Sequence, residues 1–185
     1  MTIEELSLEV EGLLGRLRED NPSPEEKKLL LVAIDAIRFI SSTGHSYDFE
    51  DYRKSLSAQE PPPVVAVFKT REEADAWLHA HPKPPHLTYV LIADAYYMVV
   101  YLRDPDRRSL GPHPALAYHL QEMLEAGLPP AVATFNTRSE ADAWFGQQAD
   151  PPAQSVIQIG NEPYLAVHHR NVHHRAIYPF ALARR

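Results

Sequence analysis

The stretch FKTREEADAW at residues 68–77 returns as FNTRSEADAW at residues 135–144, a shift of 67 positions. The agreement continues beyond the phrase without a gap, and between residues 65–78 and 132–145 ten of fourteen positions are identical. Further matches follow at the same shift: Pro84-Pro85 with Pro151-Pro152, Tyr97 with Tyr164, Arg103 with Arg170, and Arg108 with Arg175. A period of this length indicates one supersecondary unit that is present twice.

The repeated phrase joins the end of a strand to the start of a helix. VVAVF (residues 64–68) is a short β-branched run that predicts a strand. Thr70 with Glu73, and Thr137 with Glu140, form the T-x-x-E pattern that begins a helix. The two tryptophans, Trp77 and Trp144, fall on the apolar face of these helices, which predicts core anchors rather than ligand-stacking residues.

Two β-rich segments follow each of these helices, with the spacing of a hairpin. They read TYVLIA and YYMVVYLR in the first copy, SVIQIG and PYLAVHHR in the second. A helix also precedes each copy, so the expected unit is α-β-α-β-β. The fold class is therefore α+β, a tandem duplication with antiparallel sheets behind an N-terminal helical hairpin. We expect the hairpin over residues 1–45, the first repeat over 46–112 and the second over 113–185, with the repeats packed as one globular unit.

The helix start TREEADAW loosely resembles that of sporulation-related peptidoglycan-binding repeats, which also pair a strand with a helix rich in E-x-A. The resemblance covers about fifteen residues in each copy, and it implies a small α+β module without implying an activity.

The N-terminal helices carry more apolar residues than one contact requires. The first has the 3-4 spacing of a heptad at Ile3, Leu6, Val10, Leu13 and Leu17. The second runs from Ser23 to about Ile40 and is apolar on most sides, which predicts that it lies between neighbours. Two alternatives stay open for the first stripe: it packs within its own domain, or it forms a homodimer.

Composition limits the classes of protein. The formal net charge is -7, which argues against nonspecific DNA binding by the whole surface. The charge is uneven, since residues 1–60 are acidic and residues 163–185 contain no acid but four arginines and four histidines. Without cysteine there is no thiolate site or disulfide, and we expect no cofactor. No signal peptide or membrane-spanning run is evident, so a cytoplasmic location and no membrane partner are expected.

The stretch HHRNVHHR at residues 168–175 suggests a metal site, but strand geometry argues against one. Neighbouring side chains on a strand point to opposite faces. If the chain turns at Asn171-Val172, His169 faces His174 and His168 faces Arg175. One histidine pair falls short of the three or four ligands of zinc. The prediction is therefore no metal, with His169 and His174 as the only candidate ligands.

Tyrosine and arginine recur on one face of the predicted hairpins, which favours a partner-binding surface. The opposite face, with Met98, Val100 and Leu102, is expected to be the core side. The predicted partner-binding residues are Tyr97, Tyr101, Arg103, Arg108, Tyr164, His168, Arg170 and Arg175.

Catalytic signatures such as a P-loop, G-x-S-x-G or H-E-x-x-H are missing, so no catalytic residue is predicted. The leading hypothesis is a non-catalytic, bacterial-type interaction protein, in a regulatory, adaptor or immunity-like inhibitor role, with another protein as its partner. Two alternatives are binding of nucleic acid or a phosphate ligand by the basic C-terminal repeat, and a histidine-dependent hydrolase.

Overall fold

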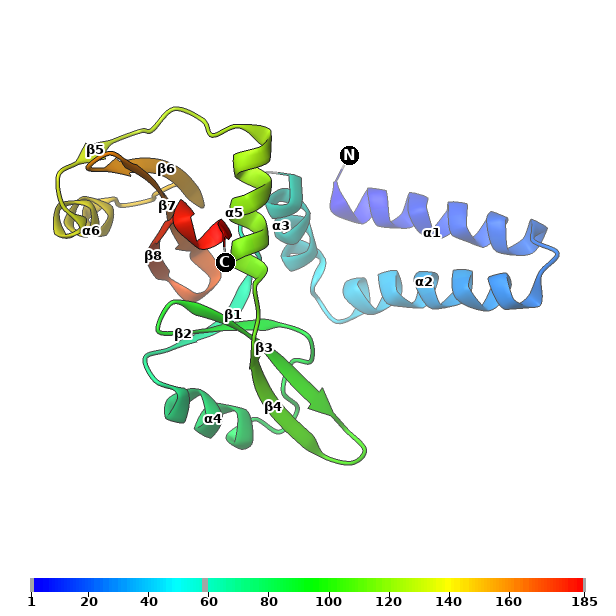
Figure 1. Ribbon diagram of the computed structural model, residues 1–185. Helices are drawn as coiled ribbons and strands as arrows, with labels where there is room; N and C mark the ends of the chain where they lie inside the picture. Colours follow the sequence, from blue (N-terminus) through cyan, green and yellow to red (C-terminus); the bar gives the residue numbers. More distant parts are fainter. Residues whose placement is uncertain (1, 58–59, 185) are drawn as a thin grey trace. The chain divides into compact units, whose positions relative to one another are not determined.

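The computed structural model describes residues 2–57 and 60–184 and divides the chain into two compact units, residues 1–60 and 61–185 (Figure 1). The first unit is helical and the second holds both copies of the repeat. The α+β class, the two-sheet duplication and the N-terminal helices are confirmed.

The first unit consists of α1 (Ile3–Asp20), α2 (Pro24–Ser42) and α3 (Ser46–Ser57). The α1 helix begins at a capping box. The Glu5 backbone N–H donates to the Thr2 hydroxyl, and the Thr2 backbone N–H donates to the Glu5 carboxylate. The α2 helix begins with Ser23 as its cap and proline at its first position. These caps place the turn between two antiparallel helices at Asn21–Ser23.

Few side chains of this unit are buried. Among its described residues only Ile3 and Ile34 are fully buried. The Nε of Arg38 lies 2.9 Å from Oε2 of Glu11 and joins α2 to α1.

The second unit repeats one βαβββ order. The first copy comprises β1 (Val64–Phe68), α4 (Arg71–Ala80), β2 (Tyr89–Ile92), β3 (Ala95–Leu102) and β4 (Arg107–Pro112). The helix α5 (Ala115–Ala126) leads to the second copy: β5 (Thr134–Phe135), α6 (Arg138–Gln147), β6 (Gln154–Ile159), β7 (Glu162–His169) and β8 (His174–Pro179). Two 3₁₀ turns complete it, η1 (Arg170–Val172) and η2 (Phe180–Arg184).

Each copy forms its own four-stranded sheet, in the orders β1-β2-β3-β4 and β5-β6-β7-β8. The sheets are mixed rather than antiparallel throughout, because β1 and β5 pair parallel with β2 and β6 across the connecting helix. The expected unit also had too few strands. The missing ones, β4 and β8, are edge strands whose sequences RRSLGP and HRAIYP contain residues typical of turns.

Three groups of buried residues hold this unit together. Ala74 and Leu78 of α4 pack against one face of the first sheet, where they meet Val99 of β3. Helix α6 packs on the second sheet in the same way. The largest group is shared by both copies and collects residues from β1–β3, α5, β6–β8 and η2. Buried residues from both copies therefore form one continuous group.

Candidate partner-binding surface

Arg108 and Arg175 occupy equivalent places, and both bind the C-terminal end of a helix. The Nη1 atom of Arg108 donates to the carbonyls of Leu78, His79 and His81 at 2.9–3.1 Å. Arg175 donates through Nη1 and Nη2 to the three equivalent carbonyls at 2.7 Å: Phe145, Gly146 and Gln148. Carbonyls at a helix C-terminus lack partners within the helix and carry its negative partial charge. These two predicted contact residues are therefore engaged inside the protein.

The tyrosines on the same face are partly covered. Tyr97 packs beside the α4 core, and the Arg71 guanidinium lies 5.7 Å from its ring centre. Tyr164 packs equivalently under α6. Tyr101 lies beneath the Arg108 guanidinium at 5.5 Å. In the first sheet the Tyr-bearing face is also a core side, because it receives α4 and Val99 is fully buried on it. In the second sheet the residues that match the expected core side, Leu165, Val167 and His169, are buried.

The other predicted contact residues differ from one another. Arg103 is exposed and forms no ion pair within the described part of the chain. Arg170 donates to the carbonyl of Pro151 at 3.2 Å and lies 3.8 Å from Asp150. His168 is half-buried, and its Nδ1 atom has no hydrogen-bond partner among the described residues. Arg103 is therefore an exposed arginine whose side chain is available for contact with a partner.

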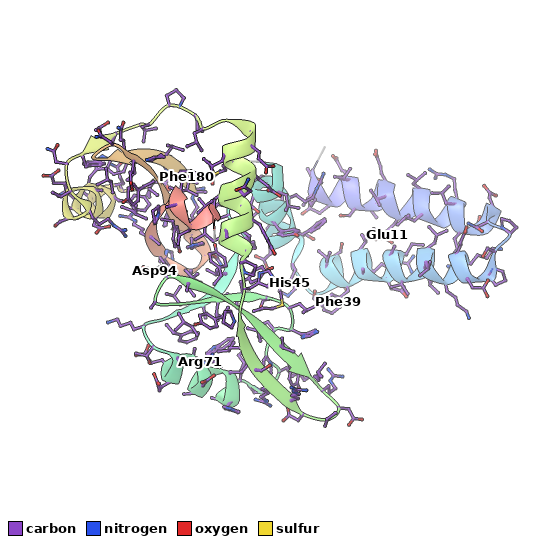
Figure 2. The ribbon with its side chains drawn as sticks, in the orientation of Figure 1. Glu11, Phe39, His45, Arg71, Asp94 and Phe180 are labelled. Atoms are coloured by element: carbon purple, nitrogen blue, oxygen red, sulfur yellow. The ribbon has the colours of Figure 1, made fainter. Side chains whose placement is uncertain are left out.

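The histidines of the second copy lie at the junction between the copies. The predicted cross-strand pairs are confirmed: His169 is opposite His174, and His168 is opposite Arg175. The Nε2 atom of His174 is 2.7 Å from Oδ1 of Asp94, which lies in the β2–β3 turn of the first copy (Figure 2). Sequence reasoning missed Asp94 because 80 residues separate it from His174.

The pKa values of this junction favour a structural role. Burial lowers the pKa of His169 to about 4, so this ring is neutral at pH 7. The hydrogen bond from His174 lowers the pKa of Asp94 below its usual range. Burial raises the pKa of Tyr178, whose hydroxyl has no hydrogen-bond partner among the described residues. Among the described residues no group of three His, Asp or Glu side chains could hold a metal ion.

The second face of the first sheet is open at the β3–β4 hairpin. Leu102 is 43% exposed, and Met98 and Val100 on the same face of β3 are half-buried. Their β4 partners Arg107 and Ser109 are exposed. An apolar strip of Met98, Val100 and Leu102 therefore lies here, with Arg107 opposite Leu102 and Arg103 in the adjoining β3–β4 turn. We call these five residues the hairpin face.

The equivalent face of the second copy is closed. Leu165, Val167 and His169 match Met98, Val100 and Leu102, and their exposed fractions are 0%, 1% and 5%. Helix α5 and the 3₁₀ turn η2 contribute to the core that covers them, with Phe180 beside α5 (Figure 2). The tip of the second hairpin is also engaged, because the Asn171 side chain donates to the Val64 carbonyl of β1. One copy thus buries the surface that the other leaves open.

Three comparisons with known proteins give no further information on the function of this chain. No protein-family model, curated protein or solved structure matches this chain. The resemblance of the TREEADAW helix start to sporulation-related repeats thus receives no support from them. Over residues 2–57 and 60–184, every helix is too short or too polar to span a bilayer.

Proposed function

We propose that the protein is a non-catalytic interaction protein, in a regulatory, adaptor or inhibitor role, that binds another protein through the hairpin face of its first repeat. The observation that carries this proposal is the difference between the copies. At the same sheet positions, the second copy buries its side chains in the shared core and the first copy exposes them.

The chemistry of the hairpin face suits a protein partner. Met, Leu and Arg supply apolar contact area and forked hydrogen bonds, which are features of protein interfaces. Arg103 and Arg107 form no ion pair within the described residues, so they are available for carboxylates of a partner. We therefore propose a partner with an apolar patch flanked by acidic side chains.

The alternative of nucleic-acid binding by the second repeat receives less support. Arg170 and Arg175, its two described arginines nearest the histidines, donate to backbone carbonyls of their own repeat. Phosphate binding needs such side chains to be available and would make affinity strongly dependent on salt. Arg185, part of the basic tail, lies outside the described residues.

The test is capture of a partner from nuclease-treated native lysate with the wild type and Leu102→Asp. Leu102 is only partly buried, so the substitution leaves the core intact while placing a charge in the apolar strip. The matched control is Val132→Asp, because Val132 is 63% exposed and lies outside the hairpin face. Circular dichroism and urea unfolding confirm that both variants fold.

A stoichiometric protein that is captured by the wild type and Val132→Asp but lost with Leu102→Asp would support the proposal. Retention by all three proteins would refute the hairpin face, and capture of no protein by the wild type would refute the function. Arg103→Glu combined with Arg107→Glu should abolish capture as well, because both carboxylate contacts would become repulsive.

A further inference from the structure

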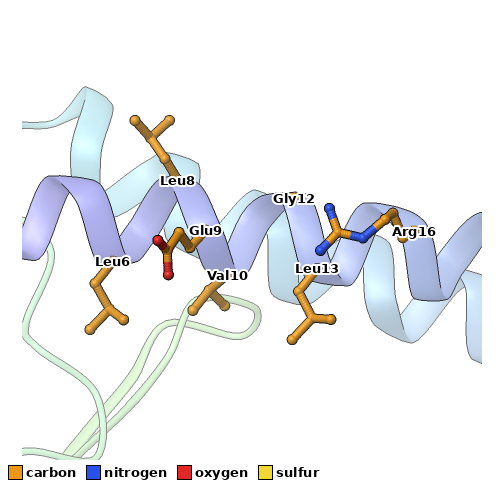
Figure 3. A pocket seen from close by; sticks show the side chains of 7 residues that line it. All are labelled: Leu6, Leu8, Glu9, Val10, Gly12, Leu13 and Arg16. Atoms are coloured by element: carbon orange, nitrogen blue, oxygen red, sulfur yellow. The ribbon is translucent and has the colours of Figure 1, made fainter. Parts of the chain in front are cut away.

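Exposed apolar side chains lie along α1 and at the β3–β4 hairpin. Along α1 they line a hollow of about 410 Å³, where Leu6, Val10 and Leu13 point to one side of the helix and Leu8 to the other (Figure 3). This helix lies outside the duplicated unit, so nothing in the chain indicates what covers it. The hairpin face, in contrast, has an equivalent in the second copy, and there the cover belongs to the same chain.

In the second copy, the face that matches the hairpin face receives helix α5. Leu120 of α5 is fully buried and belongs to the same buried group as Leu165 and Val167 of β7. The Nε2 atom of His119 lies 2.9 Å from Oε1 of Gln154, and Gln154 is opposite Val167 in the β6–β7 register. The sheet of this repeated unit therefore has a face that fits a helix.

The first copy has the same sheet positions without the helix. Val100 matches Val167 and is half-buried, and Leu87 matches Gln154 and is 59% exposed. The backbone N–H of Leu87 donates to the Val99 carbonyl, so this residue lies beside β3. Where the second copy has a polar side chain in contact with α5, the first copy thus exposes an apolar one. This difference enlarges the apolar surface next to the hairpin face.

The hairpin face continues the shared core along β3. Tyr96, Met98, Val100 and Leu102 lie on one side of the strand, and exposure rises from 3% at Tyr96 to 43% at Leu102. Met98 and Leu102 are about 13 Å apart along the strand. A helix rises about 1.5 Å per residue, so roughly nine residues cover this length. The 12 residues of α5 show that a helix of this size suits the unit.

The tip of the hairpin gives one end of this face a positive charge. Arg107 begins β4 and Arg103 lies in the adjoining turn, and both are exposed. Asp106 of the same turn is engaged, because its Oδ1 atom lies 3.0 Å from Nε of Arg108. Asp104 is therefore left to face two arginines, and the balance favours carboxylates of a partner at this end.

We propose that the hairpin face binds an amphipathic α-helix of the partner protein, with apolar residues at i and i+4 and acidic residues at the end over the hairpin tip. The proposal rests on the proposed function and names the element that the partner contributes. The helix lies across Met98, Val100 and Leu102 as α5 lies on the second sheet, with carboxylates beside Arg103 and Arg107. Docking of an amphipathic helix on an apolar surface is a recurring mode of recognition.

The probe is a synthetic peptide of residues 114–127, because the α5 segment fits the equivalent face of the second copy. Fluorescence anisotropy measures its binding to the full chain. We expect a dissociation constant of roughly 100 µM, since a peptide of this length must fold as it binds. Leu102→Asp in the protein, or Leu120→Asp in the peptide, should weaken binding about tenfold or more. Val132→Asp in the protein is the matched control and should leave binding unchanged.

Amide chemical shifts of the isotope-labelled chain locate the bound peptide. We expect changes at Leu87 and at residues 98–107, together with a rise in the helical circular dichroism of the peptide. Changes confined to residues 165–174 would overturn the proposal, because the peptide would then only displace α5. A bound peptide without helical signal would also overturn it, since this would indicate a strand added at β4. Absence of binding at about 1 mM peptide, far above the expected dissociation constant, would do the same.

The charge of the probe tests the acidic end of the partner helix separately from the apolar contacts. A peptide with one aspartate added at each end should bind severalfold more tightly than one with a lysine added at each end. Arg103→Glu combined with Arg107→Glu should reverse this order. The same order in both proteins would contradict the role of the two arginines in selecting the partner.

The lysate experiment distinguishes failure of this inference from failure of the proposed function. If the wild type captures a protein that Leu102→Asp loses, while the peptide does not bind, the hairpin face is a binding surface whose partner is not a helix. If the wild type captures no protein, the proposed function and this inference are both wrong.

Discussion

The recurring arginines illustrate how a side chain that suggests function serves structure instead. Arg108 and Arg175 are separated by 67 residues, and each donates to three carbonyls at the end of its copy's helix. The guanidinium carries five N–H donors in one plane, so it can donate to several carbonyls at once. Their presence in both copies therefore follows from the need to end α4 and α6 against β4 and β8.

Arg175→Lys should lower the free energy of unfolding by about 2 kcal/mol, because Arg175 donates from two nitrogen atoms held in one plane, whereas an ammonium keeps the charge but offers a single nitrogen. Urea unfolding monitored by circular dichroism measures the difference. Arg103→Lys is the control and should change stability by less than about 0.5 kcal/mol, because Arg103 is exposed. Equal effects at the two positions would contradict the role of Arg175 at the helix end.

Burial of His169 should make stability depend on pH. The folded-state pKa of His169 is about 4, below its value of about 6.5 in the unfolded chain. Between these values the unfolded state binds a proton and the folded state does not, so stability is present above pH 6.5 and falls as pH decreases towards 4. The contribution is at most about 3 kcal/mol.

His169→Leu should reduce this loss, and leucine is the residue that the first copy has at the matching position. The measurement is the unfolding free energy of wild type and variant between pH 7 and pH 4.5. His79→Leu, at an exposed histidine, is the control. If the two variants and the wild type lose stability in parallel, the buried ring is not responsible.

At the scale of elements, the two copies form the equivalent turns β2–β3 and β6–β7 with different residues in the left-handed conformation. The first copy places Ala93 at φ 46° and Asp94 at φ 62°, whereas the second uses Gly160 at φ 60°. The left-handed region costs an L-residue with a Cβ about 1–2 kcal/mol, and glycine enters it freely. The carboxylate of Asp94 gains the contact with His174 from this turn.

Ala93→Gly should therefore raise the unfolding free energy by up to about 1 kcal/mol, after the greater entropy loss of glycine is subtracted. The reverse change in the other copy, Gly160→Ala, should lower it by about 1 kcal/mol. No atom lies within 4 Å of a Cβ built at Gly160, so the effect comes from the backbone alone. Thermal and urea unfolding check both values, and a stabilising Gly160→Ala would contradict the turn argument.

The sequence predicted the local features of the fold well. The caps at Thr70 and Thr137, the helix start at Ser23 and the 169–174 strand register are all present. These features depend on residues close together along the chain. The i,i+4 spacing of Arg71 with Asp75 and of Arg138 with Asp142 is typical of an ion pair within a helix, and both pairs are present.

Long-range features were harder to predict. The face that receives α4 could not be told from alternation, because both faces of β3 are largely apolar. The strands β4 and β8 were missed because their pairing with β3 and β7, rather than their own composition, makes them strands. The candidate site moved for the same reason, from the Tyr-bearing face to the opposite one.

For the whole of residues 61–185, the shared core predicts joint unfolding of the copies. Leu165 of the second copy is fully buried in the same group as Leu91 and Tyr96 of the first. Leu165→Ala should cost about 3 kcal/mol and speed hydrogen exchange in both sheets. Faster exchange in β5–β8 alone would show that each copy unfolds separately.

The duplication also explains how a contact surface could arise. The two copies contribute different surfaces to the shared core: the second copy is closed by α5, η2 and β1, while the first keeps its hairpin face. The proposed function depends on this asymmetry rather than on any residue that the copies have in common.

The most direct test of this account is hydrogen–deuterium exchange of the full chain with and without the captured partner. The account predicts slower exchange at residues 98–107 of the first copy when the partner is bound. The matching residues 165–174 of the second copy should be unchanged. Protection of residues 165–174 without protection of 98–107 would contradict the proposed surface.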